Sequence, residues 1–239
     1  MARKIVFVIV EGPSDDDALG VLLDKIYDKN TVYIHITHCD ITLADYTDVS
    51  QVLRKITELV RTYAKNNHLT KIHFKEIIHI IDTDGVYIPD EAVIFDSTAE
   101  KPIYTLTNIL TNKVEKIRER NQRKRQCLNK IAIQDTLWGI PYQAYYMSCN
   151  LDHALYGKMN SSDEEKEEDS LAFAQKYRDD IEGFIQFICE SDFSIMGDYR
   201  ESWKYIQQEG LYSLQRYTNL GICIMKAINN EESEETDKL

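Results

Sequence analysis

The chain of 239 residues is poor in the residues that mark non-globular proteins. It holds only four prolines and nine glycines, while hydrophobic residues make up 43% of it. This composition excludes collagen-like and low-complexity architectures and argues against a disordered chain. The length fits one large domain, or one domain with an added subdomain. We therefore expect a globular protein with a sizeable core.

Long apolar runs and paired cysteines are also missing. No stretch approaches the roughly 18 apolar residues that span a bilayer, and the first apolar run is not followed by the small-residue cleavage site of a signal peptide. The five cysteines include no Cys-x-x-Cys pair, which argues against disulfides and cysteine zinc sites. A mixed donor group, His35, His38, Cys39 and Asp40, is a poor zinc site, because neighbours along a strand point to opposite faces. We expect a soluble, cytoplasmic protein without a membrane partner.

Basic residues are outnumbered, 28 against 40 acidic ones, which gives a formal net charge of −12. Any contact with nucleic acid is then limited to a local patch. The candidate patch is the segment 113–130, which contains eight basic residues and only two acidic ones. The residues expected to contact a nucleic-acid backbone there are Arg118, Arg120, Arg123, Lys124 and Arg125. The alternative interpretation is an ordinary solvated helix face.

Apolar runs of strand length alternate with helical patterns in the first half of the chain. Residues 4–10, 31–37 and 74–81 have the apolar, β-branched composition of buried strands, and 49–64 has apolar residues at helical spacing. Pro13 and the acidic residues after it are typical of a helix start. This alternation predicts an α/β fold: a Rossmann-like, mostly parallel sheet flanked by helices.

The second half suggests further divisions. We predict a catalytic domain over 1–158 with a basic helical insertion near 103–130, the helix itself covering 103–128, and a strand over 143–149. An acidic linker is predicted for 159–170, a helical C-terminal subdomain for 171–230 and a disordered acidic tail for 231–239.

Carboxylates follow two of the predicted strands. Glu11 comes directly after the first strand, and Asp82 and Asp84 follow the strand over 74–81. Carboxyl ends of parallel strands meet at one edge of a sheet, so these side chains meet if the two strands are neighbours. Mg²⁺ takes oxygen ligands and needs only one or two carboxylates. Each motif alone also has an ordinary interpretation, an Asx-rich turn for Asp82 and Asp84 and a helix-start acid for Glu11.

Taken together, the two motifs resemble a known family. Val-Glu-Gly-Pro-Ser-Asp at 10–15 and Ile-Ile-Asp-Thr-Asp-Gly at 80–85 resemble the two signature motifs of the TOPRIM domain. The Glu-Gly-x-Ser-Asp form, followed by a helix with Asp-Ala-Leu, is most similar to the overcoming-lysogenization-defect (OLD) nucleases and to small TOPRIM proteins encoded beside separate ATPases. The resemblance covers about residues 3–155 and leaves the C-terminal third unmatched.

The resemblance implies roles for individual residues. Glu11 would be a metal ligand or general acid/base, Asp82 and Asp84 metal ligands, and Asp15 a ligand of a second ion. Two Mg²⁺ or Mn²⁺ ions roughly 3.5–4 Å apart would then support phosphodiester hydrolysis.

Two further residues extend this predicted site. Asp152 stands where OLD-type proteins often have another acidic ligand, although a carboxylate at a helix start is an equally good interpretation. Lys158 is the nearest candidate for the catalytic lysine that OLD-type sites use to offset phosphate charge.

At the level of function, the resemblance implies a metal-dependent endonuclease acting on DNA or RNA, including transfer RNA. The chain contains no Gly-x-x-x-x-Gly-Lys-Ser/Thr motif, so ATP hydrolysis would fall to a separately encoded ABC-class ATPase. The expected setting is a toxic effector of bacterial anti-phage defence, and the apolar C-terminal helices suggest a homodimer. The alternative is a non-catalytic TOPRIM module that binds nucleic acid or a partner.

Overall fold

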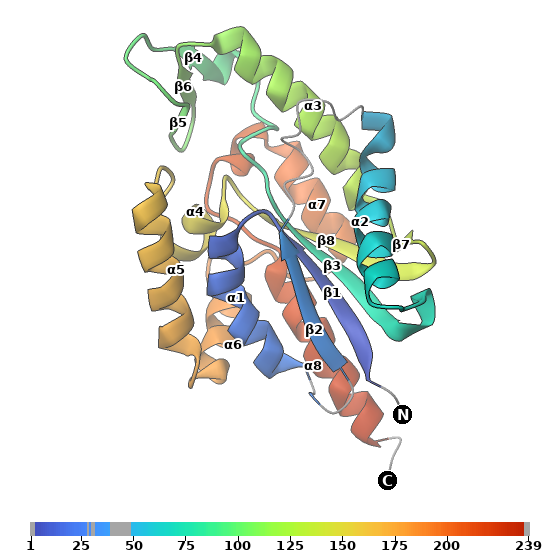
Figure 1. Ribbon diagram of the computed structural model, residues 1–239. Helices are drawn as coiled ribbons and strands as arrows, with labels where there is room; N and C mark the ends of the chain where they lie inside the picture. Colours follow the sequence, from blue (N-terminus) through green and yellow to red (C-terminus); the bar gives the residue numbers. More distant parts are fainter. Residues whose placement is uncertain (1–2, 28, 30–31, 39–48, 237–239) are drawn as a thin grey trace.

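The computed structural model describes residues 3–27, 29, 32–38 and 49–236 (Figure 1). Its main sheet has five strands in the order β2-β1-β3-β8-β7. All neighbouring strands are parallel except β7 and β8, which are antiparallel. The predicted α/β fold with a mostly parallel sheet is therefore confirmed. The strands are β1 (Lys4–Val10), β2 (Val32–His38), β3 (Phe74–Asp82), β7 (Thr136–Leu137) and β8 (Ile140–Met147).

Helices cover both faces of this sheet (Figure 1). One face is covered by α2 (Val52–Asn66) and α3 (Val114–Ala132), and the other by α1 (Pro13–Ile26) and α8 (Leu220–Thr236). Because both faces are covered, residues 6–10 of β1 are almost completely buried. The other helices are α4 (Leu151–Tyr156), α5 (Asp163–Tyr177), α6 (Ile181–Glu190), α7 (Tyr199–Gln208) and the 3-10 turns η1 (Val49–Gln51), η2 (Lys71–His73), η3 (Asp90–Ala92) and η4 (Gly210–Ser213).

The C-terminal third completes the edge of the main sheet. Strand β7 pairs only with the start of β8, so the later residues of β8 need other partners for their backbone groups. Tyr199 Oη accepts a hydrogen bond from Ala144 N–H at 3.1 Å, and Trp203 Nε1 donates to Ala144 O at 3.1 Å. Asn219 Oδ1 accepts from Tyr146 N–H at 2.7 Å. The region 171–230, predicted as a subdomain, therefore shares its core and hydrogen bonds with the sheet.

A second, small sheet is formed by the residues that lie between β3 and α3 in the chain. It consists of β4 (Val93–Phe95), β6 (Ile109–Thr111) and β5 (Ile103–Tyr104), in that order. The prediction of a helix over 103–128 is wrong for its first part, because Thr105 and Asn108 close a tight turn between β5 and β6. The helix begins at Val114, and it buries Leu128 and Ile131 in the main core. The inserted element is thus the small sheet rather than the basic helix.

The acidic segment predicted as a linker is mostly helix α5. Its start is a capping box, in which Ser162 Oγ accepts from Glu165 N–H at 3.2 Å and Glu165 accepts from Ser162 N–H at 2.8 Å. This Ser-x-x-Glu signal stabilises a helix start even where the charge density favours a solvated coil. Helix α5 packs along α1, so the segment forms a layer outside α1 (Figure 1).

The chain end also differs from its prediction. Helix α8 continues to Thr236, where a disordered tail was predicted for 231–239, while 237–239 lie outside the described residues. Within the part of the chain that the structure describes, no helix is long and apolar enough to cross a membrane.

Candidate active site

The two carboxylate motifs meet at the carboxyl edge of the main sheet. Strands β1 and β3 are parallel neighbours, so Glu11 and Asp82 reach the same edge, as predicted for neighbouring strands. Glu11 Oε1 accepts a hydrogen bond from the Asp82 backbone N–H at 3.1 Å. The first motif therefore holds the second in register through a direct contact.

The loop between the two aspartates is fixed by its middle residue. Thr83 is fully buried; its Oγ1 donates to Ser213 O at 2.9 Å and accepts from Cys149 N–H at 2.9 Å. Asp84 N–H donates to Cys149 O at 2.7 Å. These bonds connect the end of β3 to β8 and to η4, so the loop is held on two sides.

The backbone after Asp82 turns through the left-handed region. Asp84 has φ 49° and Gly85 has φ 66°, conformations that aspartate tolerates and glycine favours. A Cβ added at Gly85 would collide with the Leu214 side chain. Glycine is thus required here both for conformation and for space.

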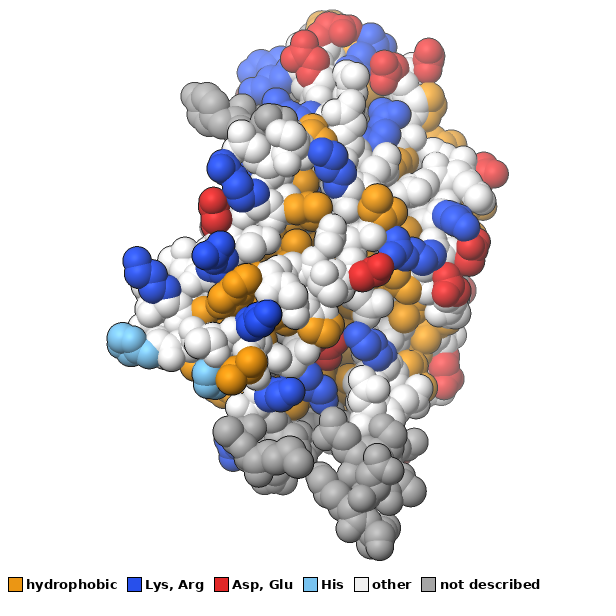
Figure 2. Space-filling view, turned by 90° about the vertical axis from the view of Figure 1, so that its right-hand side faces the viewer, with side chains coloured by type: hydrophobic (Ala, Val, Ile, Leu, Met, Phe, Trp, Pro, Cys, Tyr) orange, Lys and Arg blue, Asp and Glu red, His pale blue; other side chains and the backbone are white. Residues whose placement is uncertain are grey.

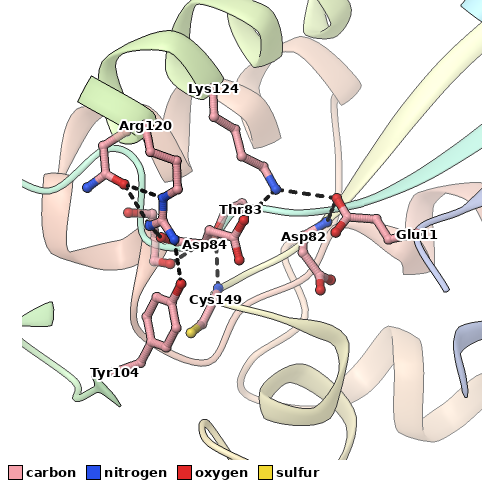
Figure 3. A network of polar contacts seen from close by, with 10 residues as sticks. Glu11, Asp82, Thr83, Asp84, Tyr104, Arg120, Lys124 and Cys149 are labelled. Carbon is pink, nitrogen blue, oxygen red and sulfur yellow. Dashed lines mark hydrogen bonds and ion pairs between the residues drawn. The ribbon is translucent and has the colours of Figure 1, made fainter. Parts of the chain in front are cut away.

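Lys124 of α3 is the basic residue at the centre of the site (Figure 3). Its side chain is only 1% exposed, and its Nζ lies 2.6 Å from Asp84 Oδ2 and 3.4 Å from Glu11 Oε1. A buried ammonium between two carboxylates offsets their mutual repulsion. Lys124 was predicted as a surface contact to nucleic acid, and the structure places it inside the site instead.

Arg120, one turn before Lys124 on α3, connects the site to the small sheet (Figure 3). Its guanidinium donates to Asp84 O at 3.0 Å and to Tyr104 Oη at 2.7 Å. It also donates twice to Asn121 Oδ1, at 2.7 and 3.1 Å. Arg120 therefore positions the Asp84 loop and strand β5 relative to each other rather than forming an exposed basic surface.

Asp15 and its neighbours line a pocket in front of these carboxylates. The Asp15 carboxylate accepts from Gly12 N–H at 2.8 Å, which caps the start of α1. The pocket has a volume of about 480 Å³, and four of the predicted ligands line it: Glu11, Asp15, Asp82 and Asp84. The structure therefore brings the core of the predicted site together.

The two aspartates of the second motif have opposite electrostatic environments. Burial and the negative charges of Glu11, Asp15 and Asp84 raise the pKa of Asp82 well above its usual value. Burial also acts to raise the pKa of Asp84, but the cations Lys124 and Arg120 outweigh it and hold that pKa below its usual value. Burial, aided by the charge of Asp152, raises the pKa of Asp15 to about 6. The carboxyl groups of Asp82 and Asp15 thus hold their protons more tightly than usual, and a cation on that side of the pocket would favour their charged forms.

The oxygen donors fit a hard divalent cation. Four carboxylates share the pocket, and Lys124 neutralises only part of their charge. Oxygen-rich, negatively charged sites are those that Mg²⁺ and Mn²⁺ prefer. Among the described residues, however, no three His, Cys, Asp or Glu side chains form a group that could already hold a metal ion. Lys124 occupies the space between Glu11 and Asp84, so an ion that used both would have to displace it.

Two other predicted site residues lie outside the pocket. Lys158 is 47% exposed, forms an ion pair with Asp169 at 2.6 Å and is not among the residues that line the pocket. Asp152 is buried in the first turn of α4 and does not line the pocket. Its charge nevertheless raises the pKa of Asp15, so it belongs to the electrostatic surroundings of the site.

The rest of the predicted nucleic-acid contacts on α3 are only partly accessible. Arg118 pairs with Glu115 at 2.8 Å and donates to Asp90 O at 3.1 Å. Arg123 and Arg125 are half-buried. Of the His35, His38, Cys39 and Asp40 donor group, Cys39 and Asp40 lie outside the described residues.

A basic surface that the sequence analysis did not single out lies over α2. Figure 2 shows Lys and Arg side chains spread across this face of the molecule, with acidic ones gathered toward the margins. The segment 49–75 holds six Lys and Arg residues and a single acidic one, Glu58. Arg54, Arg61 and Lys65 of α2 are exposed. The net charge of −12 is therefore distributed very unevenly over the molecule.

Lys166 is the site residue that the sequence analysis missed. It belongs to the acidic start of α5, yet it is half-buried and lines the pocket, whereas 162–165, 167 and 168 are exposed. Helical spacing places Lys166 in line with the buried residues Ser170, Phe173 and Tyr177. This spacing could have predicted that Lys166 faces inward from a helix, but the segment was predicted to be a linker.

No family model matches this chain, and no solved structure matches it. The assignment of the site therefore depends on its own geometry and chemistry.

Proposed function

We propose that this protein is a metal-dependent phosphodiesterase that cleaves nucleic acid. The observation that carries the proposal is the pocket itself, where Glu11, Asp82 and Asp84 from two neighbouring strand ends meet Asp15 from α1 beside the buried ammonium of Lys124. Carboxylates crowded in this way are costly unless cations offset them. A divalent ion together with a phosphodiester is a chemical complement to such a site.

Each residue has a role that follows from its contacts. Glu11 is held by Asp82 N–H and lies near Lys124, so its carboxylate has a fixed direction toward the pocket. Lys124 is placed to stabilise negative charge on the phosphate in the transition state, since a preorganised cation in a partly dry site is effective there. Mg²⁺ or Mn²⁺ held by Glu11, Asp15, Asp82 and Asp84 would supply an activated water and stabilise the leaving oxygen.

The resemblance of the two motifs to TOPRIM domains, and to OLD nucleases among them, supports the same chemistry. It also suggests the wider setting that we propose, a cytoplasmic anti-phage effector controlled by a separately encoded ABC-class ATPase. The uneven charge provides two distinct surfaces, basic over α2 and acidic along α5, for a nucleic acid and a partner respectively.

A non-catalytic binding module is the second candidate, and one observation favours it. Lys124 already bridges Glu11 and Asp84, so the carboxylates can be partly neutralised without any metal ion. In that case the pocket would bind nucleic acid or a partner without cleaving a bond.

A cleavage assay with matched carboxylate variants separates the two candidates. Plasmid DNA, single-stranded DNA and total cellular RNA would be incubated with Mg²⁺, Mn²⁺ or EDTA, with and without any ATPase that co-purifies with the protein. We expect cleavage that needs a divalent ion and falls at least about a hundredfold in Glu11→Gln and Asp82→Asn. Glu201→Gln is the control, because Glu201 is an exposed carboxylate on α7 whose ion-pair partner is Lys204. Cleavage that survives in both site variants would contradict the proposal.

A further inference from the structure

The pocket has two walls above its carboxylate floor, and they come from distant parts of the chain. One wall is formed by residues 101–104, which lead into and form strand β5 of the small sheet. The other is formed by residues 159–161 and by Lys166 of α5. The carboxylates therefore lie at the base of a pocket whose sides come from the small sheet and from the segment that leads into α5.

The two walls are fastened together by one side chain. Asn160 Oδ1 accepts from Tyr104 N–H at 2.8 Å, and Asn160 Nδ2 donates to Tyr104 O at 2.8 Å. This paired contact repeats the hydrogen bonding of a neighbouring strand. Arg120 holds the same tyrosine from below through its Oη. The width between the walls is thus set by the protein before any substrate binds.

Each wall presents a lysine toward the pocket. Lys101 is exposed at the end of one wall, and Lys166 is half-buried in the other. The charge of Lys166 acts on the carboxylates of the floor, since it contributes a lowering of the pKa at both Asp15 and Asp84, although burial raises the pKa of Asp15 overall. Cations on both sides of a phosphodiesterase site are suited to the phosphates that flank the scissile one.

Apolar side chains accompany these cations. Pro102, Ile103 and Met159 line the pocket. Ile103 is 39% exposed and pairs with Leu110, which in turn pairs with the 41% exposed Ile94. Residues paired across a sheet share one face, so these three form an apolar row that leads from the outside of the small sheet into the pocket.

This combination points to one class of substrate. Single strands are bound by grooves that offer cations to the backbone and flat or apolar surfaces to the bases. In a duplex the bases are stacked and paired, so they cannot reach apolar side chains inside a pocket of about 480 Å³. We infer that the pocket takes an unpaired strand of nucleic acid, with Lys101 and Lys166 on the flanking phosphates and the apolar row of Ile103, Leu110 and Ile94 against the bases. The inference rests on the proposed function and narrows its substrate.

The test compares paired and unpaired forms of one sequence. Short fluorescent oligonucleotides of DNA and of RNA, each single-stranded and annealed to its complement, would be given to wild type, Lys166→Gln, Ile103→Ser and the control Lys176→Gln. Lys176 lies on the same helix but is exposed and stacks on Tyr177, away from the pocket. Cleavage gives kcat and KM, and fluorescence anisotropy in EDTA gives binding independently of metal and catalysis.

We expect the single-stranded forms to be cleaved at least about tenfold faster than the duplexes. Lys166→Gln should raise KM about tenfold with a smaller change in kcat, and should reduce the slope of log affinity against log salt by about 0.7. Ile103→Ser should reduce the preference for single strands, and Lys176→Gln should behave as wild type. The DNA and RNA arms identify which of the two is the substrate.

The outcomes separate this inference from the proposed function. Equal cleavage of duplex and single strand would overturn the inference while leaving the phosphodiesterase intact. If nothing is cleaved, the proposed function fails and the binding data decide the inference. A single-strand preference in anisotropy that Ile103→Ser reduces, with weaker overall binding in Lys166→Gln, would support it, and equal affinity for both forms would overturn it.

Discussion

Two charged helices contribute to the same site and carry opposite net charge. Helix α3 has seven basic and two acidic residues, whereas α5 has six acidic and two basic ones. Both nevertheless direct a lysine inward, Lys124 from α3 and Lys166 from α5. The sign of a helix's net charge therefore says little about its role at the site. The inward-facing position on the helix decides that role.

The two lysines differ in what surrounds them. Lys124 is buried and paired with two carboxylates, while Lys166 is half-buried among exposed acidic residues. Under the proposed function, the first would act on the reacting phosphate and the second on a neighbouring one. Variants of residues around the two lysines test whether their roles differ in this way.

The largest effect is expected for Lys124→Met. Methionine keeps much of the side-chain volume but removes the charge, so cleavage should fall about 10²- to 10³-fold, as for loss of a preorganised charge-stabilising group. Single-turnover rates of cleavage would measure it. Lys116→Met is the matched control, an exposed lysine on the same helix. If the cleavage rate of Lys124→Met is no lower than that of Lys166→Gln, the two lysines have equivalent roles.

Asp15, which lines the pocket, should make the free energy of unfolding depend on pH. The pKa of Asp15 is raised from 3.8 to about 6 by burial, so the folded state binds this proton more tightly than the unfolded state. The resulting stabilisation is complete below pH 3.8 and is lost as the pH rises through about 6. In EDTA, wild type should therefore gain about 1–2 kcal/mol relative to Asp15→Asn between about pH 7.5 and about pH 5.

Urea unfolding at the two pH values checks this. The pKa of Asp82 is raised partly by the charge of Asp15, so the difference between wild type and Asp15→Asn reports Asp15 together with its effect on Asp82. A constant difference at both pH values would contradict the prediction.

An intermediate effect is expected for Arg120→Gln. The variant loses the contacts to Asp84 O and Tyr104 Oη, so the Asp84 loop and the β5 wall would no longer be held together. Misplacement of groups around the reacting atoms lowers the rate without changing the chemistry, so we expect kcat/KM to fall about tenfold. Arg118→Gln is the control, since Arg118 bonds only outside the pocket. Equal activity of the two variants would remove Arg120 from the site.

The smallest effects on stability and cleavage are expected for substitutions near the start of α5. Ser162→Ala removes the capping hydrogen bond and should lower the free energy of unfolding by about 1 kcal/mol. Lys158→Ala removes an exposed ion pair with Asp169 and should change cleavage less than about twofold. Denaturant unfolding and the oligonucleotide assay measure these. A large loss of cleavage in Lys158→Ala would restore its predicted catalytic role.

The sequence predicted the sheet and the floor of the site because both depend on local patterns. Buried strand runs ended in Glu11 and in Asp82-Thr83-Asp84-Gly85, and parallel pairing of β1 with β3 brought these ends together. The walls could not be predicted in the same way. Their residues meet only through contacts between distant parts of the chain, such as Asn160 with Tyr104 and Lys124 with Glu11.

Charge patterns were the less reliable guide. A run of basic residues suggested an exposed binding helix, but α3 has an apolar face that turns Lys124 inward with Leu128. A run of acidic residues suggested a linker, but the Ser162 cap and the spacing of Phe173 and Tyr177 make it a packed helix. In both segments, periodicity carried more information than composition.

The anchoring of Thr83 has a consequence for protein engineering. Its hydroxyl donates to the Ser213 carbonyl, 130 residues further along the chain, and the loop between Asp82 and Asp84 depends on that bond. A minimal fragment that ends after α4 would contain every carboxylate of the floor and still lack the support of this loop. Anyone who transplants the site to another scaffold, or divides the chain into two complementing pieces, would have to carry the segment around η4 along with the motifs.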